Sequence, residues 1–417
     1  MSTEPNSQPT DRLTSQQNDN VILHAKPYSA MSFREFLNEV NWVSAIFLIV
    51  TPVLAAILVP MYIYQHGWSW GLSVFLIALY TISNMSITVA YHRYFSHRSF
   101  DVPQVLQILF LLVSAMAFQG SAVRWATDHR RHHREVDTDE DPYSIKRGFF
   151  FAHLGWMLMR DRHPEANVQA KDLWKNRWVR IQHNYYVLLA ILMGFIVPGL
   201  LGQALGFGFG PGMLIGGLLR VVLSQHSTFL INSAAHTFGV QPYTDRNSAK
   251  DSTTMAFLTF GEGYHNYHHF FQADYRNGIR WYQWDPTKWF IRTLAAIGLA
   301  YKLKKVSLEE VQKARIAMEE KRIVAKGASS ERVQALRERI LNTQRRWKEI
   351  QTEFARHKVE FAVYRNSQTA KVRQMSTQVN ISLQEQRAEL ELARIEMNNA
   401  VKAWKIYVKA WLGTQPA

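Results

Sequence analysis

Two long stretches without a charged side chain constrain this chain most. Residues 40–91 contain no Asp, Glu, Lys or Arg, and the four-residue joint QHGW divides them into two apolar halves. Residues 181–219 are again uncharged, and the apolar run continues beyond Arg220; its Gly-rich centre separates segments near 185–201 and 212–231. A helix needs about 20 apolar residues to cross the hydrocarbon core of a bilayer. The sequence therefore predicts four transmembrane helices arranged as two hairpins.

A fifth apolar run, residues 103–119, is only 17 residues long and is marginal for a span. The short connections inside the two hairpins contain no Lys or Arg, whereas the segment between the second and third spans is rich in both. Positively charged loops remain in the cytoplasm. We therefore expect this segment, both termini and the C-terminal tail to be cytoplasmic. Residues 1–30 are polar, show no cleavable signal and are expected to be disordered.

Histidine is abundant and clustered, whereas cysteine is absent: the chain contains 16 His and no Cys. Any metal site must use His, carboxylate or amide ligands. Nine histidines lie in the clusters YHRYFSH, HRRHH, NSAAH and HNYHH. Residues three and four apart share a helix face, so the three histidines of HRRHH, and likewise those of HNYHH, can point the same way. Nine imidazoles predict two metals, held by His92, His97, His129, His132, His133, His236, His265, His268 and His269.

The four clusters can form one site only if they lie on the same side of the membrane. If residues 103–119 crossed the bilayer, they would separate the first two clusters, so we expect this run to be interfacial or re-entrant. The prediction is an all-α integral membrane protein with four spans and a helical cap that holds the metals. Arg220, inside the fourth span, is expected either to snorkel or to pair with a polar neighbour such as Ser224 or Gln225.

The histidine-rich set also indicates the chemistry. A simple zinc hydrolase uses three ligands and a carboxylate base, which this set does not match. Two irons in a membrane protein instead indicate activation of O₂ to oxidise an apolar substrate, because side chains alone supply no oxidant strong enough for an unactivated methylene. The net charge of +15 does not lead to nucleic acid, since the charge-free stretches point to a bilayer, and we expect no nucleic-acid partner.

The motifs HRYFSH, HRRHH, NSAAH and GEGYHNYHH resemble the three histidine boxes and the accessory motif of membrane fatty acyl desaturases, most closely the stearoyl-CoA, Δ9 type. The resemblance covers roughly residues 30–315. It implies four transmembrane helices under a cytosolic cap, two iron ions held by the nine histidines, and Asn232 as a water-mediated ligand. It further implies that O₂ and two electrons introduce a cis double bond into a saturated long-chain acyl-CoA. Trp125 and Thr228 resemble residues that shape the bent acyl tunnel.

The sequence departs from this family mainly where the acyl carrier would bind. The animal enzymes have an Arg two residues before the second box, where this chain has Thr127, and the Trp beside the tunnel Thr is Phe229 here. The segment that helps to hold CoA reads RDRHP, and we expect Arg124, Arg160 and Arg162 to contact the substrate's phosphates. An acyl-lipid desaturase and a related histidine-box hydroxylase remain open alternatives, as does a non-catalytic membrane scaffold.

The C-terminal tail has a different composition. From Lys302 onward the chain has 24 Lys and Arg against 13 Asp and Glu. Apolar side chains recur at spacings of three and four in two series separated by RNSQTA, which predicts two amphipathic helices in a hairpin or coiled coil. We therefore interpret residues 1–30 as the N-terminal segment, 31–315 as the desaturase domain and 316–417 as the tail.

The tail contains no HPGG and does not resemble a cytochrome b5 domain. The resemblance to desaturases therefore implies that electrons arrive from a separate donor protein. Two interpretations of the tail stay open. It is either a solvated helical appendage or an element that docks a partner protein or anionic lipid.

Overall fold

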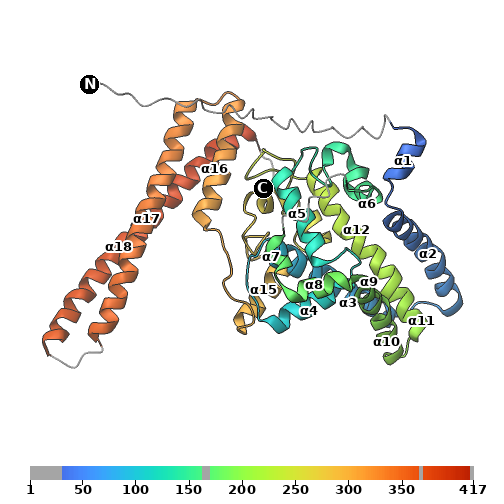
Figure 1. The fold of residues 1–417 in the computed structure, drawn as a ribbon. Helices are drawn as coiled ribbons and strands as arrows, with labels where there is room; N and C mark the ends of the chain where they lie inside the picture. The colour runs from blue at the N-terminus through green and yellow to red at the C-terminus, as the bar shows by residue number, and fades with distance from the viewer. Residues whose placement is uncertain (1–30, 162–169, 366–369, 414–417) are drawn as a thin grey trace, which may run out of the picture.

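The computed structural model describes residues 31–161, 170–365 and 370–413. Within these ranges the chain is helical, and its β-structure is limited to four isolated bridges. Figure 1 shows long membrane-type helices on the right, short helices and loops around α5 in the centre, and a helical arm on the left. The all-α class predicted from the sequence is confirmed.

Four helical segments are long and apolar enough to cross a membrane, and they match the four predicted spans. The first is α2 (Trp42–His66), and the second is α3 (Trp70–Ser86) continued by the π-helix η2 (Ile87–Ser96). The third contains α9 (Tyr186–Ile191), η6 (Leu192–Ile196) and α10 (Val197–Ala204). The fourth contains α11 (Phe209–Pro211), η7 (Gly212–Leu219), α12 (Arg220–Ser233) and η8 (Ala234–His236).

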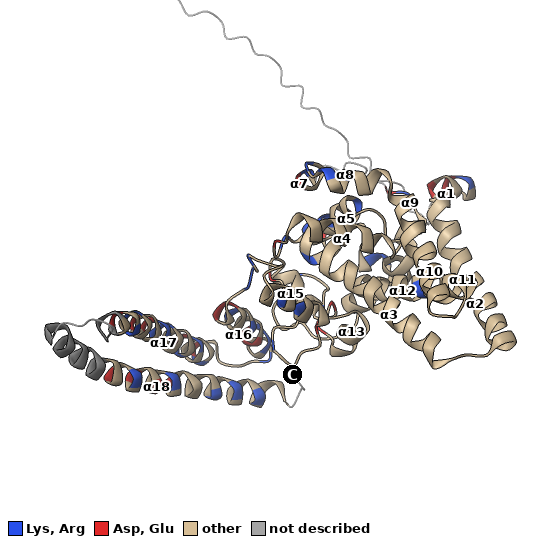
Figure 2. Cartoon of the chain, turned by 90° about the horizontal axis from the view of Figure 1, so that it is seen from below, with Lys and Arg blue, Asp and Glu red and all other residues tan. Residues whose placement is uncertain are grey.

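The surface of α2 shows why these helices belong in a bilayer. Val43, Ile46 and Ile49 each leave more than half of their surface exposed, at 83%, 57% and 56%. Apolar surface left in water costs roughly 25 cal/mol per Å² compared with apolar surroundings, a cost that lipid chains remove. Figure 2 shows Lys and Arg mainly on the cap helices and the arm and few along the spans. The chain is therefore an integral membrane protein.

The end of the second span is wound more widely than an α-helix. In η2 the backbone N–H of His97 donates to the carbonyl of His92 at 3.1 Å, the i→i+5 pattern of a π-helix. Residues five apart then come close to alignment along the helix. The π winding therefore explains how a cluster with HxxxxH spacing can direct both imidazoles to one site.

The fifth apolar run forms α4 (Gln104–Ala115), a helix of 12 residues. At 1.5 Å per residue it is about 18 Å long, which is shorter than a bilayer core. It does not reach the length of the four candidate spans. The histidine clusters before and after α4 lie together in the folded chain, so α4 does not separate them.

Arg220 is fully buried at the start of α12, and its partners differ from those expected. Its guanidinium donates to one hydroxyl and three carbonyls, those of Ser83 (3.4 Å), Gly216 (2.9 Å), Gly194 (2.7 Å) and Met116 (2.5 Å). The predicted pairing with Ser224 or Gln225 was wrong. The sequence shows only neighbours one turn away, whereas the folded side chain joins the second, third and fourth spans to the end of α4.

Short helices build the cap around the spans, and α5, α7, α8 and α15 among them contribute to a core that includes Tyr91, Phe95, Val123 and Ile291. They are α1 (Phe33–Glu39), α5 (Ala122–Glu135), η3 (Ile145–Arg147), η4 (Phe151–Gly155), α6 (Trp156–Leu158), α7 (Lys171–Trp174), α8 (Arg177–Asn184), α13 (Thr253–Leu258), α14 (His265–Phe270) and α15 (Pro286–Ala296). Ser121 is the N-cap of α5, and its side chain accepts a hydrogen bond from the backbone N–H of Arg124. This cap fixes the start of the helix that carries the second histidine cluster.

The arm consists of α16 (Leu308–Ala325) and a hairpin of α17 (Ser330–Arg365) and α18 (Ala370–Leu412). The two long helices agree with the predicted pattern, whereas residues 366–369 of the predicted break lie outside the described residues. The sequence analysis did not identify α16 as a separate helix, and the boundary expected at 315/316 falls inside it. Ile316 and Ile323 of α16 pack against the hairpin in a core with Val333, Ile340 and Trp404.

Candidate metal centre

The nine histidines of the four clusters converge in two groups. The first histidine group contains His92, His97, His129, His133 and His268, and the second histidine group contains His132, His236, His265 and His269. Within each group, one nitrogen from every side chain lies within 4.8 Å of the others. Side chains as far apart in sequence as His92 and His268, 176 residues, thus meet at one place, which is what a shared metal centre requires.

Two short helices divide their histidines between the groups. In α5, His129 and His133 at i and i+4 join the first group, while His132 joins the second. In α14 the division is reversed, with His265 and His269 in the second group and His268 in the first. The expectation that all three histidines of a cluster point the same way was therefore too simple. Each HxxHH motif serves both groups and links them.

The contacts between imidazoles test whether these groups fit metal ions. In the first group, His97 and His129 approach to 2.8 Å between their Nε2 atoms, and His268 and His133 to 2.9 Å. In the second group, His265 Nε2 lies 3.1 Å from the Nε2 atoms of both His236 and His269. A neutral imidazole carries one N–H, so rings that meet through the same atom cannot all be hydrogen-bonded. Two ligands about 2.1 Å from one ion and at right angles have donors about 3 Å apart, which fits these distances.

The electrostatics keep these imidazoles in the form that binds metal. Burial, followed by repulsion from neighbouring imidazoles, lowers the pKa values of His129, His133, His265, His268 and His269 well below 6.5. Neutral imidazole is a borderline ligand suited to Fe, Zn, Cu or Mn. The site is thus compatible with two metal ions held entirely by nitrogen.

The second ring nitrogen of several ligands has its own partner. In the second group, His132 Nδ1 lies 2.8 Å from Asp141, and His236 Nδ1 lies 2.7 Å from the hydroxyl of Ser248. That hydroxyl donates to Asp137, so Nδ1 of His236 is the donor in its own contact. Holding the proton at Nδ1 leaves Nε2 with a free electron pair for a metal.

The first group has a buried ionic support that the sequence analysis missed. His92 Nδ1 lies 2.8 Å from Glu262, whose other oxygen accepts from Arg93 at 2.9 Å. Arg93 also contacts Asp285 at 3.0 Å, and Asn277 donates to Glu262 at 2.6 Å. Burial raises the pKa of Glu262, but His92 and Arg93 outweigh burial and lower it to about 2. The signal available in the sequence was two charged residues inside histidine motifs, HRYFSH and GEGYHNYHH.

A cavity of about 590 Å³ leads to the first group. Its lining includes His92, His129 and His265 together with the predicted tunnel residues Trp125 and Thr228. Such a volume lies in the range of small-molecule sites. The indole of Trp125 stacks on the His129 ring with centroids 4.8 Å apart, so the cavity wall and the metal centre share a surface.

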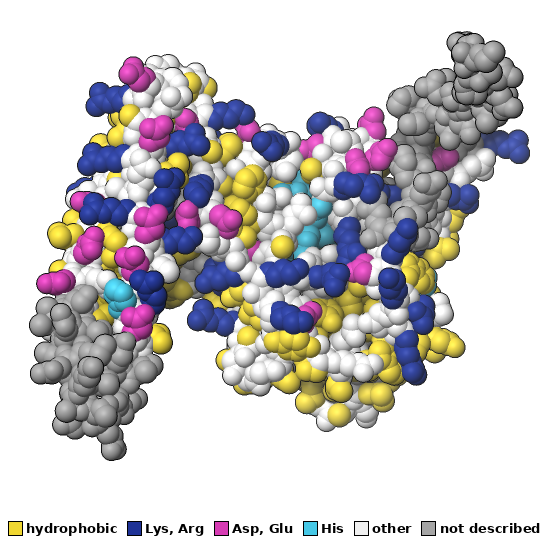
Figure 3. Space-filling view, turned by 60° about the vertical axis from the view of Figure 1, so that its left-hand side comes forward, with side chains coloured by type: hydrophobic (Ala, Val, Ile, Leu, Met, Phe, Trp, Pro, Cys, Tyr) yellow, Lys and Arg dark blue, Asp and Glu magenta, His cyan; other side chains and the backbone are white. Residues whose placement is uncertain are grey.

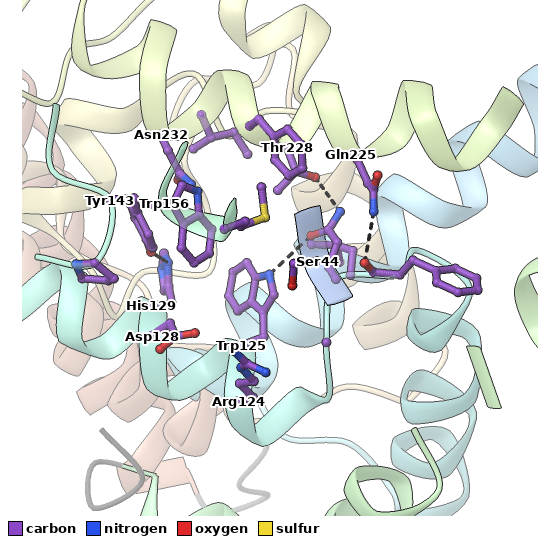
Figure 4. A pocket seen from close by; sticks show the side chains of 18 of the residues that line it. Ser44, Arg124, Trp125, Asp128, His129, Tyr143, Trp156, Gln225, Thr228 and Asn232 are labelled. Atoms are coloured by element: carbon purple, nitrogen blue, oxygen red, sulfur yellow. Dashed lines mark hydrogen bonds between the residues drawn. The ribbon is translucent and has the colours of Figure 1, made fainter. Parts of the chain in front are cut away.

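One hydrogen-bonded residue, Gln119, joins the two predicted tunnel residues. It accepts from the indole N–H of Trp125 at 3.3 Å and donates to the hydroxyl of Thr228 at 2.8 Å. Figure 4 shows Trp125 on α5 facing Thr228 on α12, with Asn232 further along α12. The sequence analysis did not single out Gln119, because an isolated Gln has no recognisable pattern.

The outer part of the cavity is charged. Arg124 and Arg160 line it, as expected, with Asp128. Arg131 also lines it and forms an ion pair of 3.1 Å with Asp161. Burial raises the pKa of Asp128 to about 6, against the opposing effect of the arginines. Arg162, the third arginine expected to contact substrate, lies outside the described residues.

These features first define the class of protein: a helical membrane protein in which nine imidazoles converge beside a cavity and can bind metal. The model of the fatty acid desaturase family matches residues 66–303. The chain therefore belongs to the fatty acid desaturase family.

Individual relatives are acyl-CoA desaturases. The chain is 36% identical to acyl-CoA desaturase 1 of Saccharomyces cerevisiae over 319 residues, which cover 74% of this chain and 60% of the relative. It is 41% identical to a probable acyl-CoA desaturase of Schizosaccharomyces pombe over 249 residues, covering 60% and 52%. It is 37% identical to stearoyl-CoA desaturase of Homo sapiens over 249 residues, covering 58% and 67%. The match thus spans little more than half of the two yeast proteins.

Proposed function

We propose that this protein is a fatty acyl-CoA desaturase that introduces a cis double bond, at the Δ9 position, into saturated long-chain acyl groups for the synthesis of unsaturated fatty acids. The observation that carries the proposal is the continuity of the cavity with the metal centre. Charged side chains, the predicted tunnel residues Trp125 and Thr228, and the ligand candidates His92 and His129 all line one cavity. The names of the relatives support the same substrate class.

In this proposal two iron ions bind, one to each histidine group, and Asn232 acts through a water molecule. When bound, the irons supply the oxidising power by which O₂ and two electrons remove hydrogen from an unactivated methylene pair. The balanced reaction consumes the saturated chain, O₂, two electrons and two protons, and yields the unsaturated chain and two water molecules. The all-imidazole donor set supports iron over Mg²⁺ or Ca²⁺, which prefer oxygen ligands.

The protein's own residues bind and bend the substrate. Gln119 holds Trp125 and Thr228 in fixed positions, so the acyl chain passes the metal centre in one defined conformation. A chain held in a bent conformation before hydrogen removal gives a cis product. Apolar lining residues such as Phe47 and Ile87 exclude water from the chain beyond this point.

CoA is the proposed carrier. Arg124, Arg160 and Arg162 would contact its phosphates, because the planar guanidinium can bind two oxygens at once. Arg131 is already paired with Asp161, and Thr127 is buried and donates to the carbonyl of Val123, so neither replaces the missing family Arg directly. Phosphate binding is therefore rearranged relative to the animal enzymes.

The cellular arrangement follows from the charges. We propose that the cap, the metal centre and both termini face the cytoplasm, because the basic segment lies between the second and third spans. Residues 1–30, 31–315 and 316–417 would be the N-terminal segment, the desaturase domain and the tail. A separate protein would deliver the electrons, and the basic tail would dock a partner.

Expression in a host that lacks its own desaturase tests the proposal. Mass spectrometry of the cellular fatty acids should find cis-Δ9 16- and 18-carbon products, and the purified protein should contain about two irons. A His268→Ala variant should lose both iron and product, since His268 contacts two other members of the first group. Desaturation of intact phospholipid without turnover of acyl-CoA would move the protein to the acyl-lipid class, and a hydroxylated product would identify a hydroxylase.

A further inference from the structure

Helix α16 lies between the hairpin of the arm and the cap, and it is fastened to the cap at both ends. At its start, the backbone N–H of Val306 donates to Asp274 at 2.8 Å, and Arg276 donates to the Val306 carbonyl at 3.1 Å. Asp274 also accepts from the hydroxyl of Tyr267, at 2.8 Å. Tyr267 belongs to α14, so the first attachment reaches the helix that carries His265, His268 and His269.

The second attachment is near the end of α16. Lys321 forms an ion pair of 2.5 Å with Asp245, and Arg322 donates to the carbonyl of Gln241 at 2.6 Å. Both partners lie in the 237–252 loop, which joins η8 to α13. An 18-residue helix is about 27 Å long, so α16 spans the distance between its two attachments as one rigid element.

The 237–252 loop supports the second histidine group. Its Ser248 receives the Nδ1 contact from His236 and bonds to Asp137. The fully buried Asn266 of α14 accepts from the backbone of Tyr243 and Thr244 and donates to the carbonyls of Thr244 and Ala249. The loop therefore connects α16 to His236 by a short series of hydrogen bonds.

We propose that α16 braces the second histidine group, with Lys321 and Arg322 as positioning residues for His236. The inference rests on the proposed metal centre but not on which acyl carrier is used. On its other side α16 holds the hairpin, where Glu319 accepts from the indole of Trp404 at 2.6 Å. The arm is thus attached to α16, the same helix that supports the metal centre.

The first histidine group depends on the loop only through His268 of α14, because His92, His97, His129 and His133 lie on η2, at its end, or on α5. Its support from Glu262 and Arg93 is buried, and its contacts run to Asp285 and to the carbonyl of Tyr275. Loosening the loop attachment should therefore affect the metal ion of the second group much more than that of the first. This difference distinguishes a bracing role of α16 from a general loss of stability.

The test uses the full-length protein carrying Lys321→Glu and Arg322→Glu together, since a single exposed ion pair contributes little to stability. Release of iron to a chelator should become biphasic, with one ion leaving on the order of threefold to tenfold faster and the other unchanged. This effect is smaller than the 10–100-fold change expected when a direct partner of a ligand is lost. Arg337→Glu is the matched control, because it breaks the 3.1 Å pair with Glu320 of the same helix without touching the loop.

Hydrogen exchange of the peptide covering residues 241–251 gives a readout that does not need metal. Protection should fall in the double variant, stay unchanged in Arg337→Glu, and return in a charge-swapped protein with Lys321→Asp and Asp245→Lys. Unchanged protection, or equal acceleration of both ions, would overturn the brace. Absence of iron from the unmodified protein would instead contradict the proposed function, and the exchange experiment would still decide the role of α16.

Discussion

The two histidine groups use the same imidazole chemistry but rest on different kinds of structure. The first group is supported by Glu262, which is enclosed with Arg93 and Asp285 in a buried ionic network. The second group is supported by Asp141 and Ser248, which lie in connections between helices and each accept a hydrogen bond from a single ring nitrogen. The two histidine groups can therefore respond differently to a substitution, although their ligands are the same.

The physical basis of the difference is the environment of each support. A buried ion pair is costly to form, but breaking it by removing one partner is costlier still, because the remaining charge has no water around it. Asp141 is also buried, but Ser248 lies in a loop with exposed residues at Asp245 and Arg246, and such a loop can relax. Loss of its support should accordingly abolish metal binding by the first group completely or not at all. The same kind of change should weaken metal binding by the second group gradually.

The largest expected effect comes from Arg93→Leu. It leaves Glu262 and Asp285 buried without their cation, and the expected loss is about 3–5 kcal/mol of stability. Thermal unfolding of the purified protein and its iron content measure this loss. Arg98→Leu is the control, because that side chain is 68% exposed and lies 3.8 Å from Asp172. A stable, iron-loaded Arg93→Leu protein would contradict the difference drawn between the groups.

Acid should act on the same network. The pKa of Glu262 is lowered to about 2, below its ordinary value of 4.5. Its contribution to stability is therefore present above about pH 4.5 and is lost as the pH falls toward 2, with a slope of at most about 1.4 kcal/mol per pH unit for one proton. Unfolding of the metal-free protein measured across this range should show that slope. Glu262→Gln should flatten it, and an identical slope in both proteins would exclude this carboxylate as its source.

A more selective effect is expected from Asp141→Asn. Asp141 holds Nδ1 of His132 and accepts the backbone N–H of Tyr143, and the amide keeps the size of the side chain while removing its charge. Losing such a partner lowers metal affinity by about 10–100-fold. Iron content after dialysis against a chelator should fall from about two ions toward one. Loss of both ions together would show that the two groups are not separable.

The smallest expected effect is that of Gln119→Ala, which touches the cavity and neither group of ligands. Trp125 and Thr228 lose their common partner, and an unsatisfied buried donor costs about 1–3 kcal/mol. Turnover should fall about tenfold, and double bonds should appear at additional positions while iron remains bound. Gln225→Ala is the control, since Gln225 lines the same cavity but donates to the carbonyl of Phe118. A single product at the native rate would remove Gln119 from the tunnel mechanism.

Figure 3 adds a view of how the arm and the cap relate. Histidine side chains are visible on the surface of the cap in this view, with basic side chains around them.

Much of the site could be predicted because it depends on local spacing. The four spans follow from uncharged runs of about 20 residues, for which a bilayer leaves few alternatives to a helix. The HxxHH motifs follow from the three- and four-residue periodicity of the α-helix, which brings His129 and His133 onto one face whatever surrounds them. The nine histidines that converge are the nine that the sequence analysis identified.

The remaining features depend on contacts between distant segments, which no local pattern records. Only the tertiary structure showed that His132 and His268 belong to a different histidine group from the other histidines of their own motifs. It also showed that η2 is a π-helix that brings His92 and His97 together. Glu262 and Gln119 gained their roles from partners more than 100 residues away. The sequence by itself determined the membrane helices and the identity of the candidate ligands, because solvent and helical periodicity act on neighbouring residues. The tertiary structure decided how those ligands are shared and supported, because burial and hydrogen bonding act only between residues that the fold brings together.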